Sequence, residues 1–133
     1  MTADATTLLQ SLEDATRGLL YPSESDFPIE PFDFGVAAPT AEALLTLRKL
    51  GPDTHVDDPT LDAFFEGLTQ VFEEASDDEQ ATAKRFQTLK SLLEDNLEDL
   101  RIYRLGNVDM GLFVLGRHAS GRWMGIRTNV VET

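Results

Sequence analysis

Apolar residues recur every three or four positions through much of the first hundred residues, which is the spacing of one helix face. This spacing predicts a first helix over about residues 4–17 and a long helix that begins at the capping-box sequence Ser76-Asp77-Asp78-Glu79. Between them, Thr40 is expected to cap a short helix that closes at Gly51-Pro52, and Asp58-Pro59 to open another. The apolar positions assigned to these four helices are, in order, Leu8, Leu12, Ala15 and Leu19; Leu44, Leu45 and Leu47; Leu61, Phe64, Phe65, Leu68 and Phe72; and Phe86, Leu89, Leu93, Leu97 and Leu100.

The last third of the chain changes to an alternating pattern, which is typical of strands. Three alternating segments, at residues 101–105, 108–114 and 124–130, predict an antiparallel three-stranded meander. Gly106-Asn107 provides the first turn, and residues 116–121 are expected to form the second connection.

One further strand is predicted before the short helices. Residues 29–36 also alternate, and Pro31 lacks the amide hydrogen that a central strand needs, so this segment is predicted to be an edge strand. The two prolines in residues 21–28 predict a loop. Helices first and a meander last favour an α+β fold in which helices cover the sheet.

Charge narrows the range of possible partners. The chain has 133 residues, 41% of them apolar, with 11 basic and 24 acidic side chains and a net charge of −13. Residues 101–133 carry five arginines and two carboxylates, a net of +3, whereas residues 1–100 carry −16. This acidity disfavours nucleic acids and anionic membranes and favours a basic protein or a cation. The charge has two interpretations, solubility (including adaptation to high salt) or imitation of a polyanion.

Several classes of site and location are excluded by what the sequence lacks. It has no cysteine, which excludes disulfides, thiolate metal sites and a cysteine nucleophile. The first residues have no basic n-region, and no apolar run approaches the length of a bilayer span. We therefore expect a single cytoplasmic domain.

The usual catalytic residues are poorly represented. His55 and His118 both fall in predicted loops without a second histidine at metal-ligand spacing, so both are expected to be solvated. No phosphate-binding glycine loop, Gly-x-Ser-x-Gly or His-Glu-x-x-His motif is present. The acidic clusters Asp57-Asp58 and Asp77-Asp78-Glu79 lack the ligand spacing of a calcium loop and fit helix capping.

Two polar segments carry the candidate chemistry. In Ser23-Glu24-Ser25-Asp26, small hydroxyls flank a carboxylate in a loop between prolines. This segment fits either a plain polar turn or a tight exposed loop that presents the carboxylate at its tip. The predicted last strand runs almost to Glu132-Thr133, so the terminal carboxylate would project from a rigid support, although on this observation alone an inert terminus is the simpler interpretation. Such oxygens are the ligands that Mg²⁺ prefers.

At these two segments the sequence resembles the nuclease A inhibitor family. The matching blocks are Gly18-Leu19-Leu20-Tyr21-Pro22-Ser23-Glu24-Ser25-Asp26-Phe27-Pro28, Tyr103-Arg104-Leu105-Gly106-Asn107-Val108, Val114-Leu115-Gly116 and Val130-Val131-Glu132-Thr133, with Phe64-Phe65 and Phe86-Gln87 between them. The similarity covers the first 35 or so residues and the last 50 well, and residues 37–75 weakly.

The resemblance implies a single nuclease-inhibitor-like domain over residues 1–133. Its fold would be a three-layer α/β/α sandwich with a largely antiparallel sheet. It would be no enzyme and would hold no cofactor or metal of its own. It would act as a monomer that forms a 1:1 complex with a Mg²⁺-dependent, sugar-non-specific nuclease of the ββα-metal type.

The resemblance also implies which residues bind the partner. Thr133 would reach the nuclease's catalytic metal and Glu24 its water shell, with Ser23, Ser25 and Glu132 beside them. The family's aromatic contact before the long helix has no clean counterpart, and Phe72 would replace it.

Two alternatives differ in their partner or their chemistry. An acidic interaction module would bind another basic protein without protecting DNA. A metal-dependent enzyme would need a multi-ligand site around Glu24 that the sequence does not display.

Overall fold

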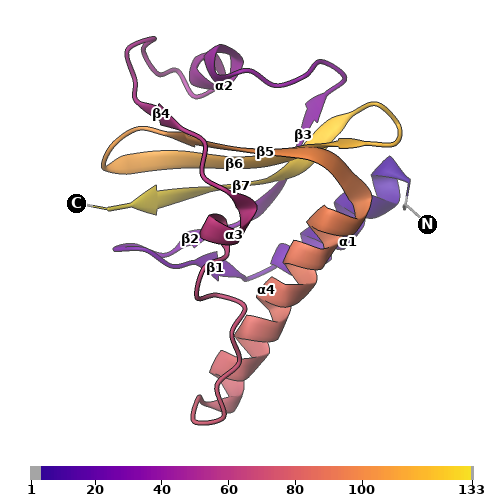
Figure 1. Ribbon diagram of the computed structural model, residues 1–133, viewed down its shortest axis with the longest axis vertical. Coiled ribbons are helices and arrows are strands. Elements are labelled where there is room, and N and C mark those ends of the chain that lie inside the picture. Colours follow the sequence, from indigo (N-terminus) through magenta and orange to yellow (C-terminus); the bar gives the residue numbers. More distant parts are fainter. Residues whose placement is uncertain (1–3, 133) are drawn as a thin grey trace.

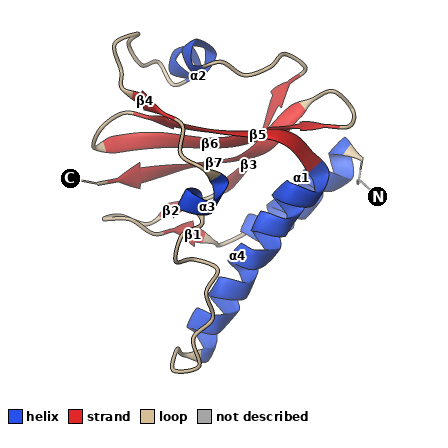
Figure 2. Ribbon diagram, viewed as in Figure 1, coloured by secondary structure: helices blue, strands red, loops and turns tan. Residues whose placement is uncertain are grey.

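The computed structural model describes residues 4–132, which contain four helices and seven strands (Figures 1 and 2). Their order along the chain is α1 (Ala5–Thr16), β1 (Leu20–Tyr21), β2 (Phe27–Pro28), β3 (Glu30–Gly35), α2 (Ala41–Leu47), β4 (Val56–Asp57), α3 (Leu61–Phe64), α4 (Asp77–Asn96), β5 (Leu97–Leu105), β6 (Asp109–His118) and β7 (Trp123–Val131). No helix in this part of the chain is long and apolar enough to cross a membrane.

The main sheet has five strands in the order β3-β7-β6-β5-β4, and every neighbouring pair is antiparallel. Consecutive strands β5, β6 and β7 form the predicted C-terminal meander. β3 lies at one edge, as the proline in its sequence predicted, with Pro31 opposite Ile126. The predicted α+β class is therefore confirmed.

Helices lie on both faces of this sheet (Figure 1). α1 and α4 cover one face, where Leu12, Leu89 and Leu93 are fully buried together with Val114 and Ile126 of the central strands. The opposite face carries α2, and its smaller core consists of Leu44, Leu45, Leu105, Phe113 and Leu115. Alternation along the central strands thus supplies two separate apolar surfaces.

The predicted caps of α2 and α4 are confirmed, and α1 begins at a cap that the sequence pattern did not predict. Thr40 accepts a hydrogen bond from the amide of Ala43 at 3.1 Å, and Ser76 accepts one from the amide of Glu79 at 3.2 Å. The Ser76 hydroxyl also lies 3.0 Å from the Glu79 carboxylate. Asp4 caps α1 through the amide of Thr7 at 2.8 Å.

The predicted end of α4 is wrong. The helix ends at Asn96, and Leu97 and Leu100 belong to β5. Both leucines lie over Gly116, where an added Cβ would come within 2.7 Å of Leu97 Cβ and 2.9 Å of Leu100 Cδ2. Gly116 thus leaves room for these two leucines on β5. Their positions also fit the helical spacing of α4, which is why the sequence pattern did not show where the helix ends.

Two other predictions need correction. The helix predicted from Asp58 is only the four-residue α3, capped by Thr60 through the amide of Ala63 at 3.1 Å, and Phe72 lies beyond it, 52% exposed. Gly67 adopts a positive φ of 77°, which breaks the helical path shortly after α3. The loop predicted over residues 21–28 contains the hairpin β1–β2, whose two-residue strands are too short to show alternation.

Candidate partner-binding site at the end of β7

The hairpin β1–β2 continues the edge of the main sheet alongside β7. The pairing of β3 with β7 begins with Glu30 opposite Arg127. Nearer the end of β7, the hydroxyl of Thr128 donates to the carbonyl of Pro28 at 2.9 Å. The hairpin loop, residues 22–26, is thereby directed along the last residues of β7.

Three hydrogen bonds hold the end of β7 between two loops. The Glu24 amide donates to the Val131 carbonyl at 3.1 Å, and the Val131 amide donates to the Ser23 hydroxyl at 3.1 Å. On the other side, the Glu132 amide donates to the Val108 carbonyl at 2.9 Å. We call these three bonds the β7 clamp. The two bonds to the hairpin loop join residues that are more than a hundred positions apart in the sequence.

Tyr21 anchors the hairpin to the body of the protein. Its ring stacks on Phe64 with centroids 4.6 Å apart, and its hydroxyl donates to the Phe64 carbonyl at 2.6 Å. Burial and the negative charge of Glu132 raise the pKa of Tyr21 to about 12, against a smaller opposing effect of Arg104. The sequence analysis missed this residue, whose only signal is an aromatic ring placed directly before the proline that opens the loop.

The structure brings together all of the predicted site residues that it describes. Glu24, Ser25 and Glu132 are exposed, whereas Ser23 is half-buried because its hydroxyl serves the clamp. The Ser23 hydroxyl also donates to the carbonyl of Ser25, which closes the loop around Glu24. Thr133 lies outside the described residues. The loop of residues 23–26 and the end of β7, which are far apart in the sequence, therefore form one polar edge of the protein.

The arginines of the last third of the chain contact acidic and aromatic side chains within the protein. Arg101 lies over the ring of Trp123, 4.7 Å from its centroid. The ion pairs are Arg104–Asp57 at 2.7 Å, Arg117–Glu98 at 3.1 Å, Arg117–Asp99 at 2.9 Å, Arg122–Asp33 at 2.9 Å and Arg127–Glu30 at 3.2 Å. The local excess of positive charge is thus balanced by carboxylates from the first hundred residues.

The two histidines have different environments. His55 is exposed as predicted, with Nε2 2.9 Å from Asp57 Oδ1. The prediction for His118 is wrong, because β6 extends to this residue and leaves it only 4% exposed, with Nδ1 2.9 Å from Ser120 Oγ. Among residues 4–132, no group of three or more potential ligand side chains could hold a metal ion.

Together these contacts define an acidic α+β protein with an exposed polar edge that its own backbone holds in place. The family model of nuclease A inhibitor-like proteins matches residues 6–133. The chain therefore belongs to the nuclease A inhibitor-like family. Membership implies the role of a nuclease inhibitor, with a protein nuclease as partner. A comparison with curated proteins finds no match.

Proposed function

We propose that this protein inhibits a Mg²⁺-dependent nuclease that cleaves DNA and RNA without sugar specificity. In this proposal the loop of Glu24 and the chain end at Thr133 enter the nuclease's active site. The carboxylate of Thr133 binds the nuclease's catalytic metal, and Glu24 contacts the water around that metal. Ser23, Ser25 and Glu132 complete the contact surface.

The β7 clamp is the observation that carries this proposal. It fixes the backbone of Glu24 to that of Val131, two residues before Thr133. Glu24 and Glu132 are thereby held on one edge of the protein, which lowers the entropy lost when their backbone is ordered on binding. Carboxylate oxygens are suited to a hard cation such as Mg²⁺ and can take the positions of phosphate oxygens.

The charge of the protein supports the same kind of partner. A nuclease that binds phosphates presents positive charge to its substrate. An inhibitor with a net charge of −13 is attracted to that charge, which raises the association rate most strongly at low salt.

The direct experiment measures DNA cleavage by a purified ββα-metal nuclease with increasing amounts of this protein. We expect inhibition that saturates at one protein per nuclease. Removal of Thr133, or addition of a short C-terminal tail, should cost about 2–5 kcal/mol, the usual cost of truncating a desolvated charged contact. This corresponds to an inhibition constant at least about 30-fold weaker. If the extended protein inhibits as well as the native one, the proposed approach to the metal is wrong.

A charge-matched pair of variants tests the role of the loop. Glu24→Gln should weaken inhibition by less than loss of Thr133, because Glu24 is proposed to act through water. Glu42→Gln removes the same charge from an exposed position in the first turn of α2, on the opposite face of the sheet, and should leave inhibition unchanged. If the two variants weaken inhibition equally, Glu24 contributes only through the net charge of the protein, and its proposed contact near the metal is wrong.

The second candidate function is an acidic module that binds a different basic protein, and the net charge of −13 is what favours it. Capture of a basic partner at low salt, with no protection of DNA from the nuclease, would support this alternative.

A further inference from the structure

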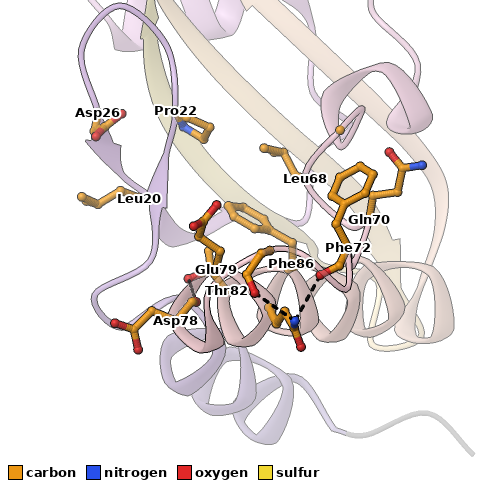
Figure 3. A pocket seen from close by; sticks show the side chains of 14 residues that line it. Leu20, Pro22, Asp26, Leu68, Gln70, Phe72, Asp78, Glu79, Thr82 and Phe86 are labelled. Carbon is orange, nitrogen blue, oxygen red and sulfur yellow. Dashed lines mark hydrogen bonds between the residues drawn. The ribbon is translucent and has the colours of Figure 1, made fainter.

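A groove of about 520 Å³ lies next to the hairpin loop (Figure 3). Its walls come from the hairpin on one side and from residues 67–75 on the other, and α4 forms its floor. The apolar part of the lining includes Leu20, Leu68, Phe72, Ala83 and Phe86. Leu20 and Phe72 are 47% and 52% exposed, so a ligand can reach both walls.

Three carboxylates border this apolar surface on the side of the hairpin loop and the first turn of α4 (Figure 3). Asp26 belongs to the hairpin loop, and Asp78 and Glu79 belong to the first turn of α4. None of the fourteen described residues that line the groove is a lysine or an arginine. The groove therefore combines an apolar interior with an uncompensated negative rim.

The wall opposite the hairpin is held in place from within. Gln80 Nε2 donates to the carbonyls of Phe72 and Ala75, each at 3.1 Å, which joins residues 72–75 to α4. Figure 3 shows these bonds at the foot of the groove, with Phe86 between its two walls. The groove is thus formed in the protein alone, so binding there requires little reorganisation.

These features select a long side chain with an apolar stem and a cationic end. An anion is repelled by the rim, and a bare metal ion gains nothing from the apolar floor. An arginine side chain satisfies both parts, because its methylene groups cover apolar surface and its planar guanidinium stacks on aromatic rings and pairs with carboxylates.

We propose that the groove receives an arginine side chain of the nuclease partner. This inference rests on the proposed function, because it is the hairpin that links the two sites. Pro22 and Asp26 line the groove, and Ser23, Glu24 and Ser25 lie between them in the sequence. A nuclease seated on Glu24 therefore borders the groove, and its phosphate-binding surface is the part of it that carries arginine.

Two pairs of matched variants test the groove in the nuclease assay. Asp78→Asn should weaken inhibition about tenfold, as expected for a lost hydrogen bond between charged groups. Asp77→Asn removes the same charge from the same helical turn, outside the groove lining, and should change inhibition less than about twofold. Leu20→Ala should weaken inhibition about fivefold, whereas Leu47→Ala, at a residue 48% exposed on α2, should not.

A second measurement uses this protein without the nuclease. N-acetyl-arginine N-methylamide is titrated while the NMR signals of Phe72, Phe86 and Leu68 are followed, with the norleucine analogue as the uncharged control. We expect millimolar binding to the arginine derivative, confined to the groove signals and weakened by Asp78→Asn but not by Asp77→Asn.

The outcomes separate this inference from the proposed function. If the native protein inhibits the nuclease but the groove variants behave like their controls, the groove inference is overturned and the inhibitor function stands. If the native protein does not inhibit, the proposed function fails, and the titration alone decides whether the groove binds arginine. NMR shifts that are spread over the whole surface, or that are equal for the arginine and norleucine derivatives, would overturn the inference that the groove binds arginine.

Discussion

Ser23→Ala tests how firmly the protein holds its proposed binding edge. The substitution removes the oxygen that accepts from the Val131 amide at 3.1 Å and that donates to the Ser25 carbonyl. Each such bond contributes about 0.5–1.5 kcal/mol net, and a part-buried amide left without its acceptor costs more than an exposed one. We therefore expect the free energy of unfolding to fall by about 1–2 kcal/mol.

Two measurements check this value. Urea unfolding gives the global loss, and amide hydrogen exchange reports on Val131 itself. Exchange at Val131 should become about tenfold faster, since about 1.4 kcal/mol corresponds to a factor of ten. Ser25→Ala is the matched control, because it deletes the same hydroxyl in the same loop but leaves the carbonyl that Ser23 contacts. The reasoning is refuted if Ser23→Ala is as stable as Ser25→Ala and exchange at Val131 is unchanged.

Three further predictions concern packing and pH. Gly125→Ala should lower the free energy of unfolding by about 3 kcal/mol or more, because the added Cβ would lie 1.9 Å from a backbone oxygen of β6. Gly51→Ala is the control, since a Cβ there meets nothing within 4 Å, and thermal unfolding of both variants measures the difference. Because the folded-state pKa of Tyr21 is raised from 10.0 to about 12, its contribution to stability is complete below pH 10 and is lost between about pH 10 and 12. Urea titrations should show this alkaline loss in the native protein and not in Tyr21→Phe. The hydrogen bond from Arg104 lowers the pKa of Asp57 below 3.8, so Asp57→Asn should be less stable than the native protein at pH 7 and converge with it as the pH falls below about 4.

Local sequence signals identified most elements of the fold because the cause of each element is local. The hydroxyl of Ser76 and the carboxylate of Glu79 three residues later predict where α4 begins, and the structure shows both groups in contact. The end of α4 could not be read in the same way. Leu97 and Leu100 fit the helical spacing, but both belong to β5, where they pack over Gly116 on a strand that follows later in the chain.

The same contrast applies to the candidate site. A polar loop between prolines singled out residues 23–26, and a strand pattern that runs almost to the chain end singled out the last two residues. Each segment places oxygens where a metal could use them. Their proximity depends on the order of the sheet, in which β7 lies between β3 and β6 and the hairpin continues the edge that β3 begins. No periodicity in either segment encodes that order, and so the β7 clamp became visible only in the structure.

The distribution of charge takes on a different meaning once the ion pairs are known. By sequence, a basic segment follows an acidic one, which would give the protein two electrically distinct parts. In the structure, Arg122 and Arg127 pair with Asp33 and Glu30 across the β3–β7 edge, so the two signs are mixed within one sheet. What remains is a general excess of negative charge, which attracts a basic partner from any direction but specifies no orientation. In the proposed complex, orientation therefore comes from fixed geometry, which is the role we propose for the β7 clamp and the neighbouring groove. Salt should accordingly slow association with the nuclease, whereas loosening the clamp through Ser23→Ala should speed dissociation.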